Sequence, residues 1–220
     1  MSGSFGDYAE SRTLDKWLGA TDFTPPANTF IALYTSIPGD ASASGTEVTG
    51  GSYARVQLTN NTTNWPNASG TNPTIKQNGV AINFTTATAD WGTVVAFAIY
   101  DALTVGNEIA WGELLTNYTD VVPDSTTDFL NATAHPFANN DAVRVRSTGT
   151  IPTGLSASTK YYVVNSATNQ FKLSLTQGGA AVDITANGDG RIQVAKDWFK
   201  TVNNGDTFSI PINGLQLFLD

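Results

Sequence analysis

The sequence contains no cysteine and few basic residues, and each shortage excludes a class of protein. Without cysteine the chain forms neither disulfide bonds nor thiolate metal sites, so packing, alone or with oligomerisation, must stabilise the fold. Lysine and arginine together number 11 against 19 aspartates and glutamates, which gives a net charge of −8. Because nucleic-acid binding requires a basic footprint, this balance argues against a nucleic-acid partner.

Long apolar runs and the pattern of an export signal are also missing. A membrane-spanning helix needs roughly 18 or more consecutive apolar residues, and no run in the sequence approaches that length. The first residues, Met-Ser-Gly-Ser-Phe-Gly-Asp, lack the basic and apolar stretches of a signal peptide. We therefore expect a protein that is made and kept in an aqueous compartment, with no membrane partner.

Uncharged polar residues and aromatic residues make up for the low charge. Hydrophobic residues are 40% of the chain and include five Trp, seven Tyr and eleven Phe, enough to fill a core. There are 31 threonines and 19 asparagines, but only 4 of the 19 acidic residues are glutamate. Threonine and the aromatics favour strands, while Asn, Asp and Gly favour turns. The composition predicts a mostly β fold, with one large β domain or two small ones.

One short helix is predicted, over residues 6–18. Ser4 and Asp7, three residues apart, are typical of an N-cap pair, and Gly19 is a natural stop. An apolar stripe at helical spacing comprises Leu14, Trp17 and Leu18. Because such a short helix is marginal alone, we expect it to dock against a sheet or a neighbouring subunit.

The predicted strands fall into two groups. Strands of the first group are expected at 29–35, 53–59, 80–84, 94–100, 108–115, 206–211 and 215–219. The residues around 60–74 are expected to be irregular. Between about 119 and 195 the pattern changes to short alternating strands separated by Gly-rich turns, with strands at 142–146, 160–165 and 170–175. We interpret the chain as a β-sandwich or open β-barrel host domain, residues 1–118 and 196–220, that carries an inserted small β domain, residues 119–195.

Four strings of the host domain together resemble a known family. They are Ala32–Ser36 (ALYTS), Gly45–Arg55 (GTEVTGGSYAR), Thr86–Val94 (TATADWGTV) and Asn204–Pro211 (NGDTFSIP). In this order they are similar to small virion proteins of tailed bacteriophages, often labelled tail fibre and known in some phages as capsid decoration (cement) proteins. Physically they favour an architectural role: Gly50 and Gly51 permit unusual backbone angles before a strand that starts at Tyr53, and Trp91 is placed to cap the core at the start of another.

The inserted domain carries a separate resemblance. Its strings are Asp141–Val145 (DAVRV), Leu155–Asn165 (LSASTKYYVVN) and Phe171–Ser174 (FKLS). They resemble a module that recurs in phage tail and fibre proteins. Neither family supplies a catalytic residue to carry over to this chain.

Chemically reactive constellations are scarce. His135 is the one histidine and has neither a Gly-x-Ser-x-Gly nucleophile nor companion zinc ligands. Glu108 and Glu113 lie five apart on a predicted strand and so point to opposite faces, which disfavours a glycosidase pair. Asp90 and Asp101 lie at strand ends, where aspartate commonly serves turns.

Oxygen-rich loops are the remaining candidates for a ligand site. Two such clusters comprise Asp183, Asn187 and Asp189, and Asn203, Asn204 and Asp206. Their spacing does not match an EF-hand calcium loop, and hairpin turns explain the same residues. We therefore expect no enzyme, no catalytic residue, no cofactor and no metal site.

The resemblance implies a structural virion protein, most favourably a capsid decoration protein on the outer capsid surface. It would bind the major capsid protein, bridge capsid subunits as a homotrimer, and be made in the cytoplasm of the bacterial host. The host domain would make these contacts with the helix as anchor, leaving the inserted domain in solvent. The alternative is a tail fibre or tail adaptor component that binds a receptor glycan through exposed aromatics such as Tyr161 and Tyr162.

Overall fold

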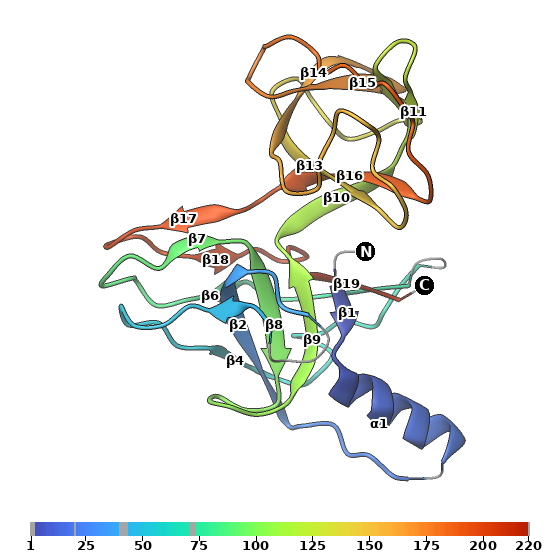
Figure 1. Ribbon diagram of the computed structural model, residues 1–220. Helices are drawn as coiled ribbons and strands as arrows, with labels where there is room; N and C mark the ends of the chain where they lie inside the picture. Colours follow the sequence, from blue (N-terminus) through green and yellow to red (C-terminus); the bar gives the residue numbers. More distant parts are fainter. Residues whose placement is uncertain (1–2, 20, 40–43, 71–73, 220) are drawn as a thin grey trace. The chain divides into compact units, whose positions relative to one another are not determined.

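The computed structural model describes residues 3–19, 21–39, 44–70 and 74–219 (Figure 1). The fold is mostly β, with sandwich-like sheets, a single short helix near the N-terminus and no closed barrel among these residues, so the predicted fold class is confirmed. Contacts divide the chain into two compact units. The host unit comprises residues 3–114 and 199–219, and the inserted unit is Leu115–Trp198.

The host unit is built on a six-stranded antiparallel sheet. In spatial order its strands are β1 (Gly3–Phe5), β9 (Glu108–Glu113), β8 (Ala96–Tyr100) and β2 (Asn28–Ser36), which pairs on its far side with β3 (Thr46–Glu47) and β4 (Val56–Thr59). Every residue of β8 is buried, as its continuous apolar run predicts for a central strand. β2 is central as well, because it pairs with β8 from Phe30 to Tyr34 on one side and with β3 and β4 on the other.

Three two-stranded ladders complete the host unit. Each joins a strand of the first half to one of the final segment: β5 (Thr74–Gln77) with β19 (Gln216–Leu219), β6 (Ile82–Asn83) with β18 (Ser209–Ile210), and β7 (Gly92–Val94) with β17 (Lys200–Val202). Phe208, Ile210 and Leu215 are buried in the host core, as predicted. The host unit therefore contains chain from both sides of the insertion.

The inserted unit is a seven-stranded antiparallel sheet with its own core. Its order is β10 (Leu115–Asp120), β16 (Ile192–Asp197), β13 (Ala142–Ser147), β14 (Tyr161–Ala167), β15 (Gln170–Ser174), β12 (Phe129–Asn131) and β11 (Val122–Asp124). Val143 and Val145 are fully buried, as their alternation with arginines predicts. The strand predicted at 170–175 ends one residue early, at Ser174, and Leu175 is exposed.

The helix α1 (Asp7–Leu18) begins differently from its prediction. Gly6 is the N-cap residue and no side chain caps the helix. Ser4, expected as the cap, lies in β1 opposite Trp111 of β9, because pairing with β9 holds it in the strand two residues before the observed cap. The predicted stop is correct: the Gly19 amide donates to the Asp15 carbonyl at 2.9 Å.

Two strand boundaries also differ from expectation. The strand expected from Tyr53 starts only at Val56, because Ser52 has a φ of 62° and the turn persists through the following residues. In the region expected to be irregular, the buried side chain of Trp65 holds the loop in place. The region ends at Thr74, where β5 begins. Short strands such as β1, β3 and β17 carry too little pattern of their own to be recognised from sequence.

Gly51 and Trp91 form one of the contacts that shape the host unit. The indole of Trp91 is buried and its Nε1 donates to the Gly51 carbonyl at 3.0 Å. Both Gly50 and Gly51 have positive φ, 71° and 54°. A Cβ on Gly51 would lie 2.9 Å from Trp91 Nε1, whereas a Cβ on Gly50 would meet nothing within 4 Å. The architectural role expected for this string is therefore visible as close packing.

Alanine substitutions at these two glycines test that packing. Gly50→Ala should lower the free energy of unfolding by about 1 kcal/mol, because only the backbone angle is penalised. Gly51→Ala should lower it by about 3 kcal/mol, since overpacking against the indole adds to the same penalty. Guanidinium chloride unfolding monitored by tryptophan fluorescence measures both values. Equal losses at the two positions would contradict the close contact.

Candidate docking surfaces

A buried ion pair organises one end of the family-like string in the host unit. Arg55 binds Glu47 in a bidentate manner, with Nη2 to Oε2 at 2.8 Å and Nε to Oε1 at 2.9 Å. The Arg55 side chain is only 8% exposed. The Tyr53 hydroxyl donates to Glu47 Oε1 at 3.0 Å and accepts the Leu33 amide at 2.9 Å. The pair thus ties the segment before β4 to β3 and to the central strand β2.

Two further tyrosines, Tyr34 and Tyr100, lie next to this ion pair and form a cluster with it. The Arg55 guanidinium carbon lies 3.7 Å from the centre of the Tyr100 ring, a close cation–π contact. The hydroxyls of Tyr34 and Tyr100 are 2.5 Å apart, and the Tyr100 hydroxyl donates to Glu108 Oε2 at 3.3 Å. Burial raises the pKa of the Tyr34, Tyr53 and Tyr100 hydroxyls above the ordinary 10.0, and nearby carboxylates raise each pKa further.

The remaining Arg55 hydrogen bonds fix the loop between β8 and β9. Its Nη1 donates to the carbonyls of Ala102 and Val105 at 3.0 and 2.8 Å. Val105 has a φ of 57°, an angle that a β-branched residue rarely adopts, and its side chain is 85% exposed. Leu103 nearby is 51% exposed. We call residues 102–106 the apolar tip: a loop held in a strained conformation that presents two apolar side chains to solvent.

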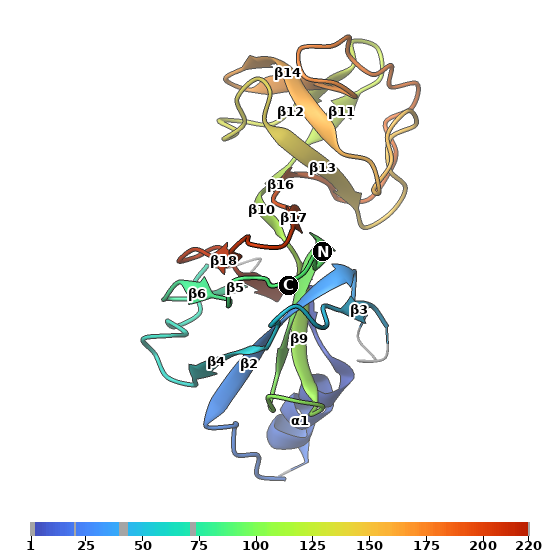
Figure 2. The same cartoon turned by 90° about the vertical axis from the view of Figure 1, so that its left-hand side faces the viewer.

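The helix α1 lies at the same end of the host unit as the apolar tip in both views (Figures 1 and 2). No residue of α1 is buried. Its apolar stripe is 59% exposed at Leu14, 79% at Trp17 and 84% at Leu18. The helix contacts β1 and β9 of the chain's own sheet, as expected, but its apolar stripe does not dock there within the described residues. Docking of the stripe on a neighbouring subunit stays a prediction.

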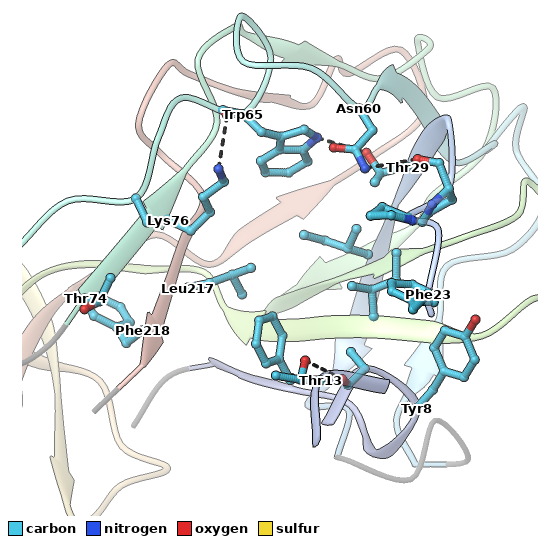
Figure 3. Close-up of a pocket in the computed structure, with 17 residues that line it drawn as sticks. Tyr8, Thr13, Phe23, Thr29, Asn60, Trp65, Thr74, Lys76, Leu217 and Phe218 are labelled. Carbon is cyan, nitrogen blue, oxygen red and sulfur yellow. Dashed lines mark hydrogen bonds between the residues drawn. The ribbon is translucent and has the colours of Figure 1, made fainter. Parts of the chain in front are cut away.

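An apolar cavity of about 340 Å³ lies beside the first half of α1 (Figure 3). Its residues all belong to the host unit: Phe5, Tyr8, Ala9, Thr13, Phe23, Pro25, Pro26, Thr29, Asn60, Trp65, Ala68, Thr74, Lys76, Ile99, Ile109, Leu217 and Phe218. Thr29, Trp65 and Ile99 are buried and form its floor, whereas Thr13 and Ala68 are exposed at its rim.

Hydrogen bonds hold the floor and one wall of the cavity in place. Trp65 Nε1 donates to Thr29 Oγ1 at 3.1 Å, and Lys76 Nζ donates to the Trp65 carbonyl at 3.1 Å. The ring of Phe23 packs edge-on against Tyr8 at 6.4 Å, which links the segment after α1 to the helix. The cavity is therefore preformed within one molecule.

The residues weighed for catalysis serve structural roles in the described chain. His135 Nδ1 accepts the Phe137 amide at 3.2 Å, and its ring packs edge-on against Phe171 at 4.7 Å. Glu108 lies in the tyrosine cluster, and Glu113 is also buried. Asp90 accepts the Asn204 amide at 2.8 Å.

The side chains of the oxygen-rich loops likewise accept hydrogen bonds from backbone amides of turns and loops. Asp189 accepts the amide of Thr150, Asn187 accepts the amide of Ser125, and Asp206 accepts the amide of Asn203. The described residues contain no group of three or more His, Cys, Asp or Glu placed to hold a metal. Of the two tyrosines considered for glycan binding, Tyr161 is buried in the inserted core and Tyr162 is half-buried.

These features define a β-rich structural protein whose distinctive surfaces are suited to docking. A family model described as podophage GP4 fiber I protein gp80 matches residues 4–134. Because the match covers more than half of the 220 residues, the chain belongs to this phage fibre protein family and is a structural virion protein. No curated protein matches the chain. None of the described helices is long and apolar enough to span a membrane.

Sequence reasoning recognised the strings around Glu47, Arg55 and Trp91 but not the cavity. The cavity draws on six separate stretches of the host unit, from Phe5 to Phe218. No short-range periodicity in the sequence indicates that these residues line one cavity. The one local hint was Trp65, a lone indole in a segment expected to be irregular.

Alkaline titration tests the buried tyrosine cluster. Because folding raises these tyrosine pKa values, the folded state holds more protons than the unfolded state above pH 10. The contribution of these three tyrosines to stability is therefore constant below pH 10 and falls as the pH rises beyond it. Absorbance at 295 nm should show Tyr34, Tyr53 and Tyr100 ionising only as the host unit unfolds. Tyr100→Phe should remove part of this alkaline loss, while Tyr162→Phe, in the other unit, should not. Ionisation of all seven tyrosines near pH 10 in the folded protein would refute the cluster.

Proposed function

We propose that this chain is a non-enzymatic subunit of a tail-associated fibre of the phage virion. The family match over residues 4–134 is the observation that carries this proposal. The match includes α1 and the six-stranded sheet apart from Gly3, so the apolar tip and the α1 stripe belong to the matched region, as does the cavity except for Leu217 and Phe218. The host unit attaches the subunit to the virion, and the inserted unit is the part available to a receptor.

The apolar tip supports the host unit as the attachment part. A strained, exposed valine persists only where neighbouring contacts impose it, and such strain is concentrated at functional sites. Here Arg55 imposes it through two carbonyls. The tip is also pinned at its base, where Asp101 accepts the Asn107 amide at 2.7 Å. A loop ordered in advance loses little entropy on docking, which favours a rigid attachment to a virion protein.

Capsid decoration is the second candidate. The host strings that resemble cement proteins favour it, and so does the absence of an internal repeat of the kind that builds fibre shafts. In that case the same tip binds the major capsid protein on the outer shell and bridges capsid subunits. Many copies engaged at once then provide the mechanical strength that disulfides would otherwise give.

Binding of the purified protein to separated virion parts distinguishes a fibre subunit from a capsid decoration protein. We expect co-sedimentation with isolated tails and none with DNA-free capsids, and cryo-electron microscopy of virions should trace the chain into density at the tail. Density on the capsid shell with bare tails would overturn the fibre assignment in favour of decoration. Binding to neither part, together with no density on the virion, would overturn both.

Charged substitutions test whether the apolar tip is the attachment surface. Leu103→Asp with Val105→Asp should weaken binding to virion parts by at least tenfold, because two exposed apolar contacts are replaced by hydrated carboxylates. The matched control is Val122→Asp, an exposed valine of the inserted unit that should leave binding unchanged. Thermal unfolding of each variant checks that the host unit stays folded. Unchanged binding by the folded double variant would exclude the tip.

A further inference from the structure

Besides the apolar tip, the host unit has two apolar features, and these two complement each other. One is the stripe of α1, three large side chains that nothing covers among the described residues. The other is the apolar cavity, whose lining is mostly hydrophobic. We infer that the α1 stripe of one copy of this chain inserts into the apolar cavity of a second copy, with Trp17 as the anchor.

A cover of this kind adds to the stability that α1 gains from its contacts with β1 and β9. An isolated helix of twelve residues is marginal in water. Within the chain α1 gains no buried residue, and its ion pair, Lys16 with Asp22 at 3.4 Å, is exposed and therefore weak. Insertion of the stripe into a second copy removes most of its apolar surface from water and supplies the missing stabilisation.

In a single chain the stripe does not fill its own cavity, because no stripe residue is among those that line it. At 100° per residue, Trp17 continues the cavity-lining face of Ala9 and Thr13 one turn further on, whereas Leu14 and Leu18 lie on the next face. A cavity beside the first half of the helix and a stripe in its second half form a head-to-tail contact between copies. Contacts of this type close into rings when the rotation between subunits permits, and a three-fold ring is the closed form we propose.

Size and charge also match the stripe to the cavity. A cavity of roughly 150 Å³ is enough to hold a benzene ring, so about 340 Å³ admits the larger indole of Trp17. Of the described lining residues, Lys76 alone is charged. Its ammonium has three N–H donors and gives one to the Trp65 carbonyl. Asp15, an exposed carboxylate next to the stripe, and the negative C-terminal end of α1 are suitable partners for the others.

The area that the stripe alone supplies is below that of a standard specific interface. Stripe side chains exposed to this degree present on the order of 400 Å² of apolar surface, and the cavity walls add the opposing surface. Specific protein contacts bury about 800 Å² per partner, with charged residues at the rim. One contact is therefore modest, and three in a closed ring reinforce one another.

Sedimentation equilibrium over a range of protein concentrations tests the inference. We expect a species with three times the 23.3 kDa mass of the chain. Trp17→Ser should raise the dissociation constant at least about thirtyfold, as loss of an interface anchor does. The matched control, Leu175→Ser, changes an exposed leucine of the inserted unit and should leave assembly unchanged. A monomer at all concentrations, or an assembly that Trp17→Ser does not weaken, overturns the inference.

Mixing two defective variants distinguishes stripe-into-cavity contact from contact between two stripes. Ala68→Trp places an indole at the cavity rim, at a residue outside α1, and should also prevent assembly. Each variant alone should be monomeric, but an equimolar mixture should form a heterodimer, because one intact stripe meets one intact cavity. Assembly of Ala68→Trp alone would show that the cavity is not used.

A charge exchange provides a second test that does not depend on Ala68. Lys76→Glu should weaken assembly, and adding Asp15→Lys in the same chain should restore it by at least tenfold relative to the single variant. The thermal unfolding of each monomer serves as the folding control. Failure of the second substitution to restore assembly by a folded protein would contradict the proposed pairing of Lys76 with Asp15.

Discussion

The bidentate ion pair of Arg55 with Glu47 is the interaction on which the host unit's arrangement depends. Removing two such charges from water costs several kcal/mol per ion, and attraction alone repays this only with good geometry and further hydrogen bonds. Both conditions hold here. Arg55 also donates to two loop carbonyls and covers the Tyr100 ring, while Glu47 accepts from Tyr53. The pair therefore contributes geometry more than net stability: it sets β3, the segment before β4 and the β8–β9 loop against one another.

Closure of the host unit is the second constraint. Strands β5, β6 and β7 pair only with strands that follow the insertion, so these ladders join residues more than 100 positions apart. Non-local pairing of this kind makes folding slow, because the loop must close before the contacts form. An inserted unit with its own core from Val121 to Val194 shortens the effective loop once it has folded. The family match ends at 134, inside the inserted unit, so the matched segment does not include the strands that complete the host unit.

Much of the fold follows from the sequence, and the reasons for success and failure are physical. The central strands were predictable because continuous apolar runs such as 94–100 report burial on both faces. The strands of the inserted unit were predictable from alternation, as at Val143 and Val145. Ser4 was assigned to the wrong structure because capping and ladder hydrogen bonds compete for the same few residues, and only the partner strand β9 decides between them. The cavity was not predictable, since its residues meet only after six stretches of chain have packed.

The charge of the chain affects how its exposed apolar side chains behave in solution. A net charge of −8 keeps copies apart at long range, so a few exposed apolar side chains need not cause general aggregation. Such repulsion is overcome only by a contact that is shaped for its partner. Head-to-tail contacts that fail to close produce filaments, whereas closed ones stop at a defined number of subunits. If copies of this chain assemble through the stripe and the cavity as proposed, a closed ring covers the stripe of every helix, whereas an open chain of subunits leaves one stripe exposed at its end.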